Sequence, residues 1–143
     1  VSPLLALTLH LPASGYAAGV ILTPDGSGAY GSGAYDLAGP AGAFTFHTRP
    51  VKPGDTLELF GVGFGPTNPA VAPGKAYTGS APVTNSVTVT IGGVSAAVLF
   101  AGMTEAGVYQ LNVTVPQVAG GDQPLVATVS GVATPAGVLI TVQ

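Results

Sequence analysis

The sequence predicts an all-β protein, an antiparallel immunoglobulin-like β-sandwich of about nine strands. Glycine and proline are abundant, with 22 and 13 residues among 143. They interrupt the chain at roughly the 8- to 12-residue spacing that strands and turns produce. Between these breaks, apolar residues alternate with polar or small ones, as they do in strands with one buried face. Segments with helical periodicity are nearly absent.

The first expected strand, residues 1–11, is strongly amphipathic. One face carries four leucines, and these are the expected subunit contacts: Leu5, Leu7, Leu9 and Leu11. The opposite face carries Ala6, Thr8 and His10. With a linker that ends at residue 14, this strand forms an N-terminal unit, 1–14, ahead of a sandwich over 15–143. Such a strand either begins its own sheet or adds to the sheet of a neighbouring copy, and the sequence leaves both arrangements open.

Three more strands and two long connections are expected in the first half of the chain. The strands cover residues 16–22, 43–48 and 56–62. Phe44 and Phe46 share one face of the second strand, and Leu57 and Leu59 share one face of the third. Residues 26–42 are expected to form a long ordered loop with a short strand. The proline-rich residues 65–82 are expected to be the longest irregular connection.

The second half reads as a series of alternating strands. They are expected over residues 86–91, 94–100, 108–115, 125–130 and 138–142. Gly92 and Gly93 predict a two-residue hairpin turn, because both central residues of such a turn take positive φ. The expected core consists of inward-facing residues from these strands and from 56–62: Leu57, Leu59, Val87, Val89, Ile91, Val98, Leu111, Val113, Val129 and Ile140.

The charge content excludes several classes of function. Only 6% of the residues are charged, and the three basic ones cannot neutralise a phosphate backbone, so no nucleic-acid partner is expected. Although 47% of the residues are hydrophobic, no apolar run approaches the roughly 20 residues that span a bilayer, and no membrane insertion is expected. Cysteine is absent, which excludes disulfides and thiolate metal sites. A charge-poor surface favours an extracellular protein that packs into assemblies.

Candidate metal and catalytic residues do not combine into a site. His10 and His47 belong to separate expected strands, without a third ligand at metal spacing. Asp55 and Glu58 form the closest carboxylate pair, and we expect a turn residue and a solvent-facing strand residue. The stretch that begins at Asp25, DGSG, lacks the further oxygen ligands of a calcium loop. No catalytic residue, metal or cofactor is therefore expected.

Three further motifs receive structural interpretations. The glycine-rich run GVGFGP leads into a proline-rich loop rather than a helix, which favours tight backbone packing over phosphate binding. Asn112 heads a formal glycosylation sequon, but it is expected in the middle of a strand. Lys52 or Lys75 with an asparagine has the groups for an isopeptide crosslink, although no spacing supports one.

Several segments in fixed order resemble a known family. From Pro53 to Gln143 they read PGDTLELFGVGFGPTNP, VTVTIGGVSAAVLFAG, GVYQLNVTVP, GDQPLVATVSGV and GVLITVQ. Together they resemble the uncharacterised C-terminal domain of large secreted acidobacterial proteins and, in outline, the IPT/TIG immunoglobulin-like domains. The upstream stretch GYAAGVILTPDGSGAYGSGAYDLAGP is also similar, which extends the resemblance to most of residues 15–143. The resemblance implies a β-sandwich, export and no assigned catalytic residues.

Two functions follow as hypotheses. The first is a non-catalytic extracellular or cell-surface structural protein, a filament or surface-layer subunit whose partner is another copy joined by strand addition. The alternative is a glycan- or protein-binding adhesion module at the end of a larger secreted protein. Sugar binding usually needs exposed aromatic platforms, and the chain has no tryptophan. Its tyrosines in or near expected loops are Tyr16, Tyr30, Tyr35 and Tyr77.

Overall fold

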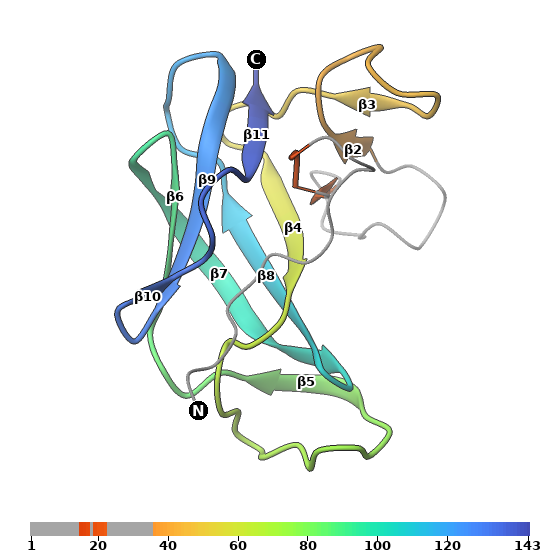
Figure 1. The fold of residues 1–143 in the computed structure, drawn as a ribbon, viewed down its shortest axis with the longest axis vertical. Helices are drawn as coiled ribbons and strands as arrows, with labels where there is room; N and C mark the ends of the chain where they lie inside the picture. Colours follow the sequence, from red (N-terminus) through yellow and green to blue (C-terminus); the bar gives the residue numbers. More distant parts are fainter. Residues whose placement is uncertain (1–14, 18, 23–35) are drawn as a thin grey trace.

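In the computed structural model, all regular structure of the described residues is β-structure (Figure 1). The structure describes residues 15–17, 19–22 and 36–143, which contain eleven strands. Among these residues no helix is long and apolar enough to cross a membrane. The strands are β1 (Gly19–Ile21), β2 (Asp36–Ala38), β3 (Thr48–Arg49), β4 (Thr56–Gly61), β5 (Thr78–Pro82), β6 (Val87–Ile91), β7 (Val94–Glu105), β8 (Val108–Thr114), β9 (Gly121–Val129), β10 (Val132–Ala133) and β11 (Leu139–Val142).

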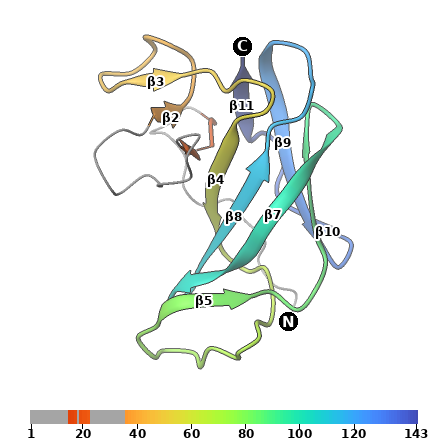
Figure 2. The ribbon, with the colours of Figure 1, turned by 180° about the vertical axis from the view of Figure 1, so that it is seen from behind.

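The strands form one mixed sheet that curls into a half-barrel (Figures 1 and 2). Its order is β10-β9-β6-β7-β8-β4-β1-β2-β3, with β11 paired to β9 and β5 paired to β7. The prediction of an all-β fold is confirmed. The sheet is mixed rather than purely antiparallel, because β2 and β3 run parallel.

The long strand β7 makes this sheet continuous. Its first three residues pair with β6, and the rest pairs with β8 and, near the end, with β5. The pairing with β8 shifts register between Val98 and Phe100 and again between Met103 and Glu105. A bulge adds one unpaired residue, bends the strand and increases its twist. Leu99 is the extra residue at the first bulge, and it is 61% exposed. These bends carry the sheet from β6 round to β5.

The C-terminal strand β11 joins the two ends of the curled sheet. Parallel bridges link Tyr16 to Leu139 and Val51 to Val142. The Ala17 amide donates to the Leu139 carbonyl at 2.9 Å, and the Leu139 amide donates to the Gly15 carbonyl at 2.9 Å. Because β11 also pairs with β9, residues 15–17 just before β1 are fastened to the opposite end of the sheet.

The core confirms the predicted alternation. Eight of the ten predicted core residues are buried, and Val87 and Val98 are half-buried against them. The turn at Gly92 and Gly93 is also confirmed, with φ of 60° and 77°. Phe64 is fully buried although it lies in an irregular segment, and no strand pattern identifies it.

The prediction of a strand over residues 43–48 is wrong. Residues 43–46 form bends, and only Thr48 and Arg49 are strand. The Phe44 and Phe46 rings stack on each other, with centroids 5.2 Å apart and planes 9° apart. The alternation of aromatic residues thus reflects ring stacking on an exposed turn rather than a strand face.

Weakly patterned strands were missed. β5 lies within the segment expected to be irregular, β9 begins four residues earlier than expected, and β10 was not predicted. β5 and the start of β9 contain Gly, Ser or Pro, which have low intrinsic strand preference, and β10 is only two residues long. They are extended because β5 pairs with β7, β10 pairs with β9, and the start of β9 pairs with β11. The expected strand over residues 1–11 lies outside the described residues.

Candidate functional site

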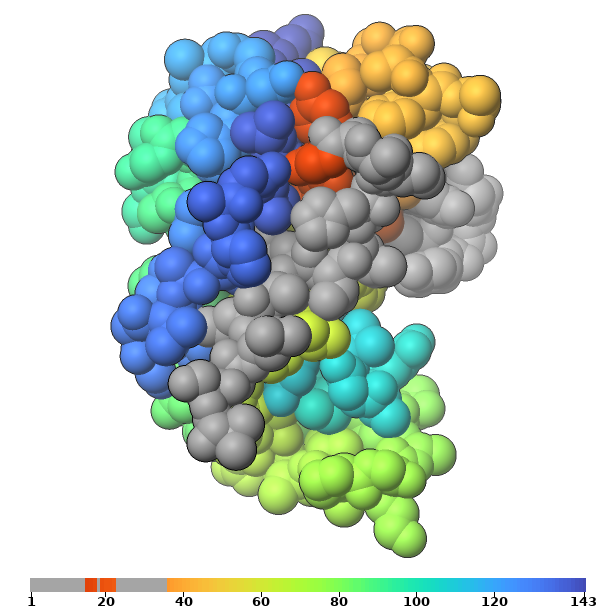
Figure 3. Space-filling view, viewed as in Figure 1, coloured from red at the N-terminus to blue at the C-terminus, as the bar shows by residue number. Residues whose placement is uncertain are grey.

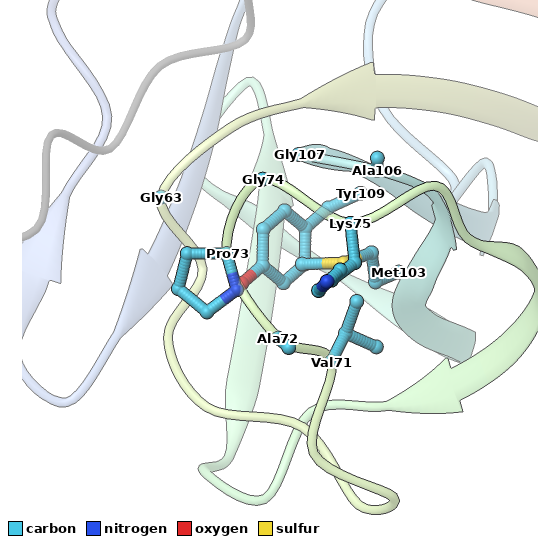
Figure 4. A pocket seen from close by; sticks show the side chains of 10 residues that line it. All are labelled: Gly63, Val71, Ala72, Pro73, Gly74, Lys75, Met103, Ala106, Gly107 and Tyr109. Atoms are coloured by element: carbon cyan, nitrogen blue, oxygen red, sulfur yellow. The ribbon is translucent and has the colours of Figure 1, made fainter.

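A hollow lies at the end of the molecule that carries β5. The space-filling view places this end opposite the β2–β3 region (Figure 3). The hollow has a volume of about 560 Å³ and lies between residues 71–75 and the β7–β8 turn. Its lining combines glycine backbone with mainly apolar side chains, of which the largest are Val71, Pro73, Met103 and Tyr109 (Figure 4).

Tyr109 forms the fixed part of this lining. The residue is buried, and its hydroxyl donates a hydrogen bond to the Gly65 carbonyl. Its ring lies 5.6 Å from the ring of Phe64. Burial raises the pKa of the Tyr109 phenol above its usual value, so the side chain is neutral at physiological pH. Tyr109 therefore offers an uncharged ring whose polar group is already bonded.

Lys75 is the only charged residue among the residues that line the hollow. It is exposed, and Figure 4 draws it among the side chains that line the hollow. The three ion pairs among the described residues involve only His47, Arg49, Asp36 and Asp55. Within that part of the chain the Lys75 ammonium has no carboxylate partner.

Three other charged residues, Asp36, Arg49 and Asp55, form a structural cluster beside β3. The Arg49 guanidinium donates from Nε to Asp36 at 2.7 Å and from Nη1 to Asp55 at 3.0 Å. Asp55 also accepts the Lys52 backbone amide at 2.9 Å, and His47 lies 3.3 Å from Asp36. Arg49 thus links β2 and β3 to the turn before β4. Because these charged groups are paired with one another, the cluster is better suited to holding β2, β3 and the turn before β4 together than to reacting with a substrate.

The two carboxylates singled out from the sequence have different surroundings. Asp55 is a turn residue, as predicted, and it is bonded to Arg49 and Lys52. Glu58 was expected to face solvent, and that prediction is wrong because only 7% of the residue is exposed. Burial raises the pKa of the Glu58 carboxyl. The residue lies opposite Val20 and Asn112 on the neighbouring strands, on the side of β4 that faces away from Leu57 and Leu59.

The remaining sequence motifs can be placed only in part. Asn112 lies in the middle of β8 and accepts a hydrogen bond from Gln110 at 3.0 Å, as expected for a residue in a strand. In the run GVGFGP, Phe64 enters the core and Gly65 accepts from Tyr109. Outside the described residues lie the four leucines and the other early candidates: Leu5, Leu7, Leu9, Leu11, His10, Asp25, Tyr30 and Tyr35.

An aromatic cluster lies on the surface near β3 and β11. The Tyr16 and Phe44 rings are nearly perpendicular, with centroids 6.4 Å apart, and Phe44 stacks on Phe46, which is 38% exposed. The Tyr16 hydroxyl donates to Asp122 at 2.5 Å, and Asp122 also accepts from Thr141. The hydrogen bond to Asp122 raises the pKa of Tyr16.

Sequence reasoning did not identify the hollow, because its walls come from distant segments. From the sequence, Lys75 was notable only as a possible crosslinking residue, Tyr109 belonged to the expected strand 108–115, and Met103 lay between two expected strands. Across the described residues no group of three or more His, Cys, Asp or Glu side chains could hold a metal ion.

No protein family, curated protein or solved structure matches this chain. The resemblance to acidobacterial C-terminal domains and to IPT/TIG domains therefore depends on the sequence motifs alone.

Proposed function

We propose that this chain is a non-catalytic structural domain of an extracellular or cell-surface assembly, in which copies are joined by strand addition. Residues 1–11 of one copy pair with a sheet edge of the next, and their leucine face, Leu5, Leu7, Leu9 and Leu11, packs on the neighbour. The curled all-β sheet is the acceptor, with the character of an immunoglobulin-like β-sandwich.

The observation that supports this proposal most directly is the edge at β10. β10 ends the strand order, and its outer side has no strand partner among the described residues. Val132 is 43% exposed, and Ala133 is exposed as well. An edge of this kind presents unpaired backbone groups that an added strand can satisfy.

The energetics and the geometry of addition fit an assembly. Each donor leucine that becomes fully buried would contribute roughly 1.5–3 kcal/mol. Donor and acceptor surfaces differ, so the contact is heterologous and each new copy exposes another edge. With only 6% charged residues, little charge has to be desolvated when surfaces meet.

The test uses full-length chains that differ at one position of the donor segment. Leu7→Asp or Leu9→Asp places a charge on the packing face and should convert fibres into monomers, because an unpaired carboxylate resists burial. Thr8→Asp puts the same charge on the opposite face of the strand and should leave assembly intact. Analytical ultracentrifugation and negative-stain microscopy measure the outcome. A monomeric wild type, or fibres from Leu7→Asp, would refute strand addition.

A second candidate is a glycan-binding adhesion module, which the Tyr16–Phe44–Phe46 cluster favours. Stacked, partly exposed rings offer the apolar faces that pack against sugars, and this cluster is the aromatic platform that the sequence did not reveal. Affinity electrophoresis in polysaccharide gels distinguishes the two functions. Phe46→Ala should abolish retardation if the chain binds glycan, whereas Leu99→Ala removes an exposed apolar side chain elsewhere and should not.

A further inference from the structure

We propose that the hollow between residues 71–75 and the β7–β8 turn binds a small organic monocarboxylate with an apolar body. This inference goes beyond strand addition and does not depend on it. The volume of about 560 Å³ lies within the range of roughly 300–1,000 Å³ that is typical of small-molecule sites. Its lining divides into an apolar part and a single charge, and that division defines the ligand class.

The apolar part receives the body of the ligand. Val71, Pro73 and Met103 contribute hydrocarbon and a thioether, and the Tyr109 ring lies among them (Figure 4). Because the Tyr109 hydroxyl is bonded to Gly65, the ring has no free donor to satisfy. The flexible thioether of Met103 adapts to differently shaped apolar groups. A hydrocarbon chain or ring that enters here therefore displaces water without leaving the Tyr109 hydroxyl unpaired.

The single charge sets the sign of the polar group. The chain has only three basic residues, and Arg49 is already paired with Asp36 and Asp55. Lys75 lines the hollow and has no carboxylate partner among the described residues. One ammonium balances one negative charge, which matches a monocarboxylate, whereas a phosphate dianion calls for further donors. A ligand with its carboxylate at Lys75 can place its apolar body on Met103 and Tyr109.

The chain contains a built-in reporter of this site. Met103 is its only methionine, so labelling the methionine methyl group with ¹³C gives a single signal from the lining of the hollow. Octanoate, 1-octanol and octylammonium are titrated below their micelle-forming concentrations. We expect octanoate to shift the signal saturably and at the lowest concentration. The two control ligands carry the same chain without the negative charge and should bind more weakly.

Matched variants test separately the charge of Lys75 and the volume of the hollow. Lys75→Gln should weaken octanoate roughly two- to fivefold, the effect of losing one exposed ion pair, and leave octanol unchanged. Lys52→Gln removes an exposed lysine at the turn before β4 and should change neither. Ala72→Trp should fill the hollow and abolish both titrations. Ala70→Trp adds the same indole at an exposed position outside the lining and should preserve them.

Three results would overturn the proposal. The first is a Met103 signal that octanoate does not shift saturably. The second is equal affinity for octanoate and octylammonium, which would remove any role for Lys75. The third is a loss of binding in Ala70→Trp as large as in Ala72→Trp, which would place the ligand elsewhere. Strand addition is measured on different residues, so its failure would leave this result untouched.

Discussion

Replacing Phe64 with alanine should be among the most destabilising single changes in the protein. Phe64 is 0% exposed and is the largest of the fully buried side chains among the described residues. Its ring also packs against Tyr109 at 5.6 Å. Truncating a buried phenylalanine costs about 3–5 kcal/mol, since the transfer free energy is lost and a cavity remains. For a domain of this size, that corresponds to a fall in Tm on the order of 10 °C.

Urea unfolding followed by far-UV circular dichroism measures this cost. The matched control is Phe46→Ala, which removes the same ring from a 38% exposed position and should cost about 1 kcal/mol. Both variants should keep the wild-type dependence on urea, because the surface exposed on unfolding hardly changes. If Phe64→Ala cost no more than Phe46→Ala, Phe64 would not anchor the irregular segment 62–77 in the core. The hollow, which this segment helps to line, would then not be preformed.

Three further experiments test the environment of single residues. Burial raises the pKa of Glu58, so the folded wild type should lose stability as pH rises from about 4.3 through the raised folded-state value. Glu58→Gln should remove this loss in urea titrations at successive pH values. Gly92→Ala should cost more than Gly93→Ala. Both positions have positive φ, costing about 1–2 kcal/mol each, but a Cβ at Gly92 meets a side-chain carbon at 2.6 Å, whereas Gly93 faces open space. Arg49→Gln should lower the free energy of unfolding by about 1 kcal/mol. High salt should reduce this stability difference between the variant and the wild type. If the stability difference were the same in high salt, the ion pairs of Arg49 with Asp36 and Asp55 would not be its cause.

Local patterns predicted those parts of the fold whose cause is local. Val89, Leu111 and Val113 alternate with polar neighbours, and that alternation alone places them in the core. Gly92 and Gly93 specify their turn because few other residues accept its backbone angles. These predictions needed no knowledge of what lies across the sheet.

Predictions failed where the cause lies in distant segments. Glu58 alternates with Leu57 and Leu59, so the pattern predicts that it faces solvent. Alternation along one strand does not reveal that other segments bury the opposite face of β4 as well. β5 is extended because β7 pairs with it, not because of its own residues. The hollow joins Lys75 to Met103 and Tyr109 only after the loop before β5 has folded onto the β7–β8 hairpin.

The fastening of residues 15–17 to β11 has a mechanical consequence. These segments run parallel, so tension that pulls residue 15 toward the N-terminus and residue 142 toward the C-terminus slides one past the other. Their two hydrogen bonds, at Ala17 and Leu139, are then loaded together rather than peeled apart in turn. Loading in shear raises the force needed for rupture, and forced unfolding is governed by the unfolding rate rather than by equilibrium stability. Tension along the chain would then be resisted where residues 15–17 pair with β11.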